Sequence, residues 1–227
     1  MTGRAFTGAA LIAALAGFTA AAAKPATGEM DRLPSWKESH LAVNDPAIRS
    51  VYILAVCTRN HRRALAEQLL DTAPGSAEEQ ALINQAVPSG MTDCPIRATK
   101  VTIHSFILMR GAIAEAFYNG EGTKPRKEAR LPPPQPLDPA AAASPRVLAW
   151  WVAGCAVRRA PALSHAVVSY NAGDISEGRA LDALRPTLLA CLPEGRRLQV
   201  LRANFRAMIA EELYHASRRY KESFRNA

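Results

Sequence analysis

Two glutamates, Glu115 and Glu211, occupy matching places in a motif that the chain contains twice. The copies read Arg110-Gly-Ala-Ile-Ala-Glu115-Ala-Phe-Tyr118 and Arg206-Ala-Met-Ile-Ala-Glu211-Glu-Leu-Tyr214. Two carboxylates that flank one sugar linkage are the chemical groups of most glycoside hydrolases. Nothing in the sequence brings the two glutamates together. A hydrolase of cell-envelope polymers that uses Glu115 or Glu211 is therefore an alternative function, which a shared cleft would favour.

The arginine and the glutamate of each motif are interpreted as structural ion-pairing residues. Arg110 and Glu115, like Arg206 and Glu211, are five positions apart, whereas neighbours on one helical face are three or four apart. Each residue is therefore expected to pair with another helix. The candidate partners are Arg59, Arg62 or Arg63 for Glu115, and Arg158 or Arg159 for Glu211.

Other chemistry receives little support from the residues. His104-Ser105 and Ser164-His165 are sequence neighbours, which is the wrong geometry for a Ser–His dyad. Glu211 and His215 have a spacing that metal sites use, but two ligands bind weakly and the first copy has Asn119 at the matching place. The chain has no phosphate-binding, dinucleotide, zinc-protease or nucleophile-elbow motif. We predict no catalytic residue, no metal ligand and no cofactor. The sequence favours a non-enzymatic function over an enzyme.

Four cysteines mark the same duplication. Cys57 and Cys94 enclose 36 residues, and Cys155 and Cys191 enclose 35. Four cysteines allow three pairings, and because each copy has two at matching places, we predict Cys57–Cys94 and Cys155–Cys191. Closing such loops stabilises a fold by roughly 3–4 kcal/mol in the chain-entropy model. The absence of a C-x-x-C spacing argues against zinc or thiol redox chemistry.

The first residues predict export. Arg4 precedes an apolar stretch of about 15 residues that ends in Ala20-Ala-Ala-Ala23, which is the pattern of a secretory signal peptide and is short of the roughly 20 residues of a membrane-spanning helix. Cleavage is expected near Ala23, and the compartment is the periplasm or the outside. Disulfides persist in such oxidising compartments.

The composition and the repeat predict an all-α fold of two homologous three-helix modules, each closed by one disulfide and packed as a pseudo-symmetric helical body. A segment with seven prolines separates the copies and is expected to be an extended spacer. The predicted organisation is a signal peptide over 1–23, a poorly ordered polar lead-in over 24–46, module 1 over 47–119, a linker over 120–145, module 2 over 146–221 and a tail over 222–227.

Periodicity places the helices. In module 1 we expect helices over 47–70, from Ser76 to before Pro88, and over 104–118. In module 2 we expect helices over 146–169, from Asp174 with a bend or end at Pro186, and over 198–221. The helix over 104–118 is apolar nearly all round, which indicates burial on several sides. We expect it to lie in an interface with module 2.

Positive charge is the remaining functional signal, with a net charge of +8. A surface of one sign attracts the opposite charge, so the leading interpretation is a non-enzymatic binding or interaction module that prefers anionic envelope partners. Lipid headgroups, lipopolysaccharide, acidic polymers and acidic proteins fit, whereas nucleic acid does not, because the arginines are not interleaved with aromatic residues. The oligomeric state stays open. The candidate anion-binding residues are Arg196, Arg197, Arg202 and Arg206.

The chain resembles small secreted proteins predicted from sphingomonad-type alphaproteobacteria. They share a duplicated cysteine module that ends in a motif like Leu-Arg-Gly-Ala-Leu-Ala-Glu-Ala-Leu-Tyr. The matching residues here run from Leu108 to Tyr118, with a related turn over Cys191–Gly195. The resemblance covers residues 47–220. It implies the fold and the compartment and no activity.

Overall fold

The described part of the chain is helical, as predicted. The computed structural model describes residues 32–34, 36, 46–86, 106–120 and 144–225, and these residues contain no strand. The first half contributes α2 (Pro46–His61), α3 (Arg63–Asp71), α4 (Ala77–Ala86) and α5 (Phe106–Gly120). The second half contributes α6 (Pro145–Arg159), α7 (Pro161–Ser169), α8 (Ile175–Cys191) and α9 (Arg202–Arg225).

The long helix predicted at the start of each half is in fact two helices. The chain breaks at Arg62 (φ −137°, ψ 45°) and at Ala160 (φ −139°, ψ 63°), so the single helices predicted over 47–70 and 146–169 are wrong. Pro161 explains the second break, because a residue before proline is disfavoured in the helical region. No proline marks the first break, although its backbone angles are similar. Each half therefore has four described helices, not three.

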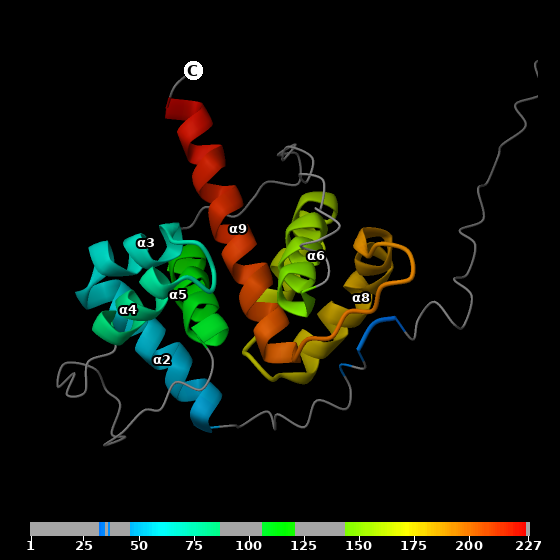
Figure 1. The fold of residues 1–227 in the computed structure, drawn as a ribbon, viewed down its shortest axis with the longest axis horizontal. Coiled ribbons are helices and arrows are strands. Elements are labelled where there is room, and N and C mark those ends of the chain that lie inside the picture. The colour runs from blue at the N-terminus through cyan, green and yellow to red at the C-terminus, as the bar shows by residue number, and fades with distance from the viewer. Residues whose placement is uncertain (1–31, 35, 37–45, 87–105, 121–143, 226–227) are drawn as a thin grey trace, which may run out of the picture.

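The helices α5 and α9 form the centre of the molecule. Their mutual contact is the most extensive between any two described helices, and Figure 1 shows α9 running between α5 and α6. Every residue of α5 from Met109 to Tyr118 is buried, in agreement with the burial predicted for this helix. At the crossing, a Cβ atom added to Gly111 would overlap Cα and Cβ of Ala207. Glycine is thus required for this close approach.

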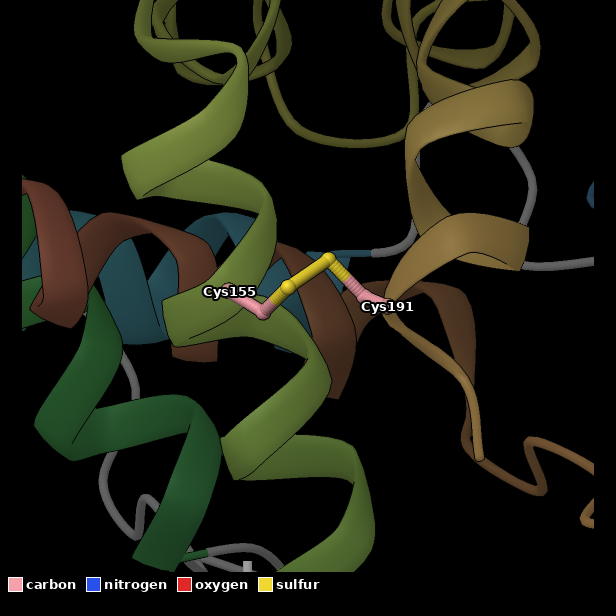
Figure 2. Close-up of a disulfide and its surroundings, with 2 residues drawn as sticks. All are labelled: Cys155 and Cys191. Atoms are coloured by element: carbon pink, nitrogen blue, oxygen red, sulfur yellow. A yellow bond between two sulfur atoms is a disulfide. The ribbon is translucent and has the colours of Figure 1, made fainter. Parts of the chain in front are cut away.

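One predicted disulfide is confirmed. Cys155 of α6 is bonded to Cys191 at the end of α8, with the two Cα atoms 5.9 Å apart (Figure 2). The bond joins two helices that also pack directly on each other. Cys57 is disulfide-bonded as well, but Cys94, its predicted partner, lies outside the described residues.

Part of the predicted polar lead-in is docked on the second half, so the expectation of poor order is wrong there. Trp36 is 2% exposed and stacks on Phe205 with ring centroids 5.5 Å apart. Arg32 donates to the backbone oxygen of Arg196 (3.0 Å), and its own carbonyl accepts from Leu198 (2.9 Å). The segment docks because burying a large aromatic side chain such as Trp36 stabilises the fold.

The remaining helix limits agree in part with the sequence. Ser76 caps α4 by accepting from the Glu79 N–H (3.0 Å), and Asp174 caps α8 by accepting from the Ser176 N–H (2.6 Å). Pro186 lies inside α8 and does not end it. The last helix begins at Arg202 rather than at residue 198.

Two predicted segments fall outside the described residues: the signal peptide and nearly all of the proline-rich linker. Within the described part of the chain, no helix has the length and apolar character that a membrane span needs.

Candidate functional site

Arg110 is a buried cation that caps the end of α3. Its guanidinium donates to the carbonyl oxygens of Leu69 (2.8 Å), Leu70 (2.8 Å) and Thr72 (2.9 Å). The last carbonyls of a helix have no partner within the helix and carry partial negative charge, which a nearby cation stabilises. Arg110 is 1% exposed, so this is a core interaction.

Arg206 does the same for α7. Its guanidinium donates to the carbonyl oxygens of Val167 (2.6 Å), Val168 (3.3 Å) and Tyr170 (2.7 Å). These three positions follow the three bound by Arg110 by 98 residues each. Arg206 is also 1% exposed.

The two ion pairs cross between the halves of the chain. Arg110 of α5 donates through Nε to Glu211 Oε1 of α9 (2.8 Å). Arg206 of α9 donates through Nη2 and Nε to the two carboxylate oxygens of Glu115 on α5 (2.7 and 3.0 Å). All four predicted ion-pairing residues therefore pair with one another, because α5 and α9 cross.

The partners expected from the first helix of each half were wrong, because Glu115 and Glu211 pair with Arg206 and Arg110. Four of the five candidate arginines have other partners. Arg63 pairs with Glu67 and Arg158 with Glu212. Arg59 and Arg62 donate to the carbonyl oxygens of Ala116 and Gln85.

A second carboxylate lies beside each buried arginine. Glu79 Oε1 is 3.7 Å from Arg110 Nη1, and Glu177 Oε1 is 3.9 Å from Arg206 Nη1. The other oxygen of each glutamate accepts from a turn glycine, Gly75 or Gly173. We call Arg110, Glu211 and Glu79 the Arg110 site, and Arg206, Glu115 and Glu177 the Arg206 site.

The two sites differ in how completely the pairing glutamate is bound. Both oxygens of Glu115 accept from Arg206, and Tyr52 supplies a further hydrogen bond. Burial raises the pKa of Glu115, while Arg206 and Tyr52 oppose that rise. In the Arg110 site, Glu211 Oε2 is buried and no described residue donates a hydrogen bond to it. Glu211 is thus only half satisfied by the protein.

Glu211 lines a cleft of about 530 Å³ formed by the end of α3, the start of α6 and the middle of α9. Small-molecule sites are typically clefts of roughly 300–1,000 Å³. The polar and aromatic residues around Glu211 in this cleft include Thr72, Arg146, Trp150, Glu212, His215 and Arg219.

Arg146 forms one wall of the cleft. Its guanidinium carbon lies 5.6 Å from the Trp150 ring centroid, and its Nη2 is 3.7 Å from Glu79 Oε2. The Nε and Nη2 atoms are buried, and no described residue accepts a hydrogen bond from them. A buried N–H without an acceptor costs free energy, so the cleft contains unsatisfied donors as well as an unsatisfied acceptor.

Two further titratable groups lie in the cleft. Glu212 is 3.8 Å from Arg158, and burial raises its pKa. His215 Nε2 is 3.5 Å from Glu211 Oε1. Among the described residues, no group of three or more His, Cys, Asp or Glu side chains could hold a metal ion.

The side chains around the Arg206 site differ from those around the Arg110 site. Tyr52 precedes Trp150 by 98 residues, and Tyr170 follows Thr72 by 98. Arg206 Nε donates a hydrogen bond to the Tyr52 hydroxyl (3.1 Å). Arg202 approaches Glu177 Oε2 to 2.9 Å, closer than Arg146 approaches Glu79.

The proposed anion-binding arginines are not one free cationic surface. Arg206 is buried and bound to Glu115, and Arg202 is paired with Glu177, so neither is an exposed cation. Arg196 is half-buried and Arg197 is exposed. The charge pattern did not predict which arginines are exposed, because several of them donate to backbone carbonyls at helix ends.

Sequence reasoning missed a hydrogen-bonded line of side chains on α5 and α7. His165 Nδ1 lies 3.1 Å from the Tyr118 hydroxyl, and His165 Nε2 lies 3.2 Å from Ser169 Oγ. Ser169 donates to the His165 carbonyl (2.8 Å), and burial raises the pKa of Tyr118. A neutral Tyr118 that donates to Nδ1 leaves Nε2 as a donor, which is the wrong polarity for activating the serine.

Glu115 and Glu211 are each bound to an arginine, and the residues that line the cleft include Glu211 but not Glu115. The condition for a two-glutamate hydrolase is therefore not met in this cleft. Comparison with protein-family models, with curated proteins and with solved structures gives no match.

Proposed function

We propose that this chain is a non-enzymatic binding protein that acts outside the cytoplasm and takes its ligand in the cleft beside Glu211. The observation that carries the proposal is Glu211, which lines the cleft and whose buried Oε2 atom has no donor among the described residues. An unsatisfied buried acceptor costs about 1–3 kcal/mol. A ligand that donates to it recovers that free energy.

The proposal includes the duplication. We infer two related modules, 47–119 and 146–221, each closed by its own disulfide and related by a pseudo-twofold arrangement at the crossing of α5 and α9. Support comes from matching contacts: the cap carbonyls, the turn glycines, and Glu79 and Glu177 in the first turns of α4 and α8 recur 98 residues apart. The Arg–Glu motifs recur 96 residues apart. One Arg–Glu site then remains structural while its counterpart has become a binding site.

Export is supported by the predicted signal peptide over 1–23 and by the bonded cysteines, since disulfides are rare in the reducing cytoplasm. The preference for an anionic partner, inferred from the sequence, is proposed to reside in the arginines of the cleft. Arg146 and Arg219 line the cleft and remain candidates for an anionic group of the ligand. The envelope partner is thus proposed to be a small fragment with an anionic group rather than an extended acidic surface.

The test blocks the cleft without touching an ion pair. Val147 lines the cleft and is 41% exposed, so Val147→Trp fills space there. Val56 on α2 is 43% exposed, does not line the cleft, and provides the matched control Val56→Trp. The probes are soluble fragments of hydrolysed cell wall and, separately, vesicles of anionic phospholipid, with binding followed by thermal shift and native mass spectrometry.

We expect a cell-wall fraction to stabilise the parent and Val56→Trp but not Val147→Trp. No stabilising fraction, or equal stabilisation of all three proteins, contradicts the proposal. Salt-sensitive binding to vesicles that is unchanged by Val147→Trp supports the surface-charge interpretation instead.

A second candidate, a hydrolase, is favoured by one observation. Glu211 and Glu212 both line the cleft, and burial raises the pKa of Glu212, as in carboxyl groups that act as general acids. Turnover of cell-wall polymer that Glu212→Gln abolishes would support this candidate. Binding without turnover supports the non-enzymatic one.

A further inference from the structure

The cleft beside Glu211 presents acceptors and donors in balance. Of the charged groups that line it, Arg110, Arg146 and Arg219 are positive and Asp71, Glu211 and Glu212 are negative. A ligand with a large net charge would leave one of these signs uncompensated, at high cost in a partly buried site. The balance favours a ligand that carries both charges.

The unsatisfied atoms define where those charges belong. Glu211 Oε2 requires a donor, and the buried N–H groups of Arg146 require an acceptor. Arg110 and Glu79 link Glu211 to Arg146 through successive contacts of 2.8, 3.7 and 3.7 Å. The ligand's donor and acceptor should therefore be separated by more than the single carbon of an α-amino acid.

The Arg206 site shows how the protein itself satisfies the pairing glutamate. There, the Tyr52 hydroxyl supplies an additional hydrogen bond to Glu115. Arg202 Nη2 donates to Glu177 Oε2, although Arg202 Nε and Glu177 Oε1 have no hydrogen-bond partner among the described residues. In the Arg110 site the position of Tyr52 is taken by Trp150, which offers no hydroxyl. A ligand ammonium beside Glu211 would play the part of the Tyr52 hydroxyl.

We propose that the cleft binds a short peptide with both termini free, its ammonium group on Glu211 Oε2 and its carboxylate on Arg146. This inference rests on the proposed binding function of the same cleft. A volume of about 530 Å³ is in the range of drug-sized ligands and accommodates several residues. The planar guanidinium of Arg146 presents paired N–H donors that suit a carboxylate.

The experiment is a calorimetric titration of the exported protein with tri-alanine, its N-acetyl form and its C-terminal amide. We expect each blocked form, and free alanine, to bind at least about tenfold more weakly than tri-alanine, as expected when one charge-assisted hydrogen bond is lost. In Glu211→Gln the N-acetyl form should no longer be disfavoured. In Arg146→Gln the amide should no longer be disfavoured, and Val56→Trp should behave as the parent.

Three results overturn the peptide assignment: equal binding of the three forms, tighter binding of a blocked form, or no binding of tri-alanine. If a cell-wall fraction still binds in a way that Val147→Trp abolishes, only the ligand class is wrong. If no fraction binds either, the proposed function itself fails.

Discussion

The Arg110 site and the Arg206 site contain the same buried groups and differ in their surroundings. In both, an arginine caps the end of a helix and pairs with a glutamate from the opposite half. In the Arg206 site both oxygens of Glu115 are bound to the arginine. In the Arg110 site, Glu211 lines a cleft, and its Oε2 atom has no donor among the described residues.

The comparison distinguishes the buried groups that stabilise the fold from the surrounding residues on which the proposed ligand binding depends. In both sites the buried arginine binds helix-end carbonyls and a carboxylate from the opposite half. The helix end and the crossing of α5 and α9 both depend on that cation. The differences lie in residues around that core. At matching positions, Tyr52 replaces Trp150 and Tyr170 replaces Thr72. The second glutamate of each site is contacted by arginines at unrelated positions, Arg202 beside Glu177 and Arg146 beside Glu79. Such changes alter access to the site and leave the core intact.

The largest effect is expected from removing either arginine. Arg110→Met or Arg206→Met leaves two buried carboxylates and several helix-end carbonyls without their cation. Breaking a buried ion pair from one side costs about 3–5 kcal/mol, so both variants should melt far below the parent in thermal denaturation. The exposed Arg197→Met is the control and should change little. If only one of the two variants had the melting temperature of the parent, the two sites would not be structurally equivalent.

The next effect tests the crossing on which both sites depend. Gly111→Ala places a Cβ against the backbone of Ala207 and should cost about 1–3 kcal/mol or more, as overpacking does. Gly154→Ala is the matched control, since its Cβ meets the ends of the Arg158 and Glu212 side chains at 2.7 and 3.0 Å, which can move. Equal melting temperatures of the two variants would contradict a tight crossing.

Local signals in the sequence predicted much of the fold. The predicted helix starts at Ser76 and Asp174 are confirmed, because a cap depends on a few neighbouring residues. The repeated cysteine spacing predicted the Cys155–Cys191 bond. The break at Arg62 was not predictable, since no proline or glycine marks it and only tertiary packing imposes it. Trp36, alone in a polar segment, gave no indication that it would dock on Phe205.

The site was only partly predictable, for a related reason. The five-residue spacing correctly excluded pairing of Arg110 with Glu115 on one helix, but the partner depends on how α5 crosses α9. That geometry is set by Gly111 and Ala207 together and is absent from either segment alone. Likewise, a cluster of arginines looks the same in sequence whether it faces solvent or helix-end carbonyls.

The smallest effect is expected at Glu212, which has Ala116 at the corresponding place near the Arg206 site. Burial raises the pKa of Glu212 above its ordinary value of 4.5, so the folded state binds this proton more tightly than the unfolded state. The resulting stability is present below that ordinary value and is lost as the pH rises through the folded pKa. Glu212→Gln should therefore melt slightly above the parent near about pH 7 and equal to it near about pH 4.

Melting curves at the two pH values, with His215, Glu211, Arg158 and Arg219 unchanged, provide the measurement. A variant that is less stable than the parent at the higher pH would show that the Arg158 contact outweighs the cost of burial.

The most direct test of the account compares Glu115→Gln with Glu211→Gln in one experiment. Each variant is titrated with the cell-wall fraction that stabilises the parent, after circular dichroism has shown that it is folded. Glu115→Gln should lose more stability, because it gives up two charge-assisted hydrogen bonds rather than one, each worth about 1.5–3 kcal/mol, yet bind as the parent does. Glu211→Gln should bind at least about tenfold more weakly. Parent-like binding by Glu211→Gln, or an equal loss in both variants, would contradict the division into a structural site and a binding site.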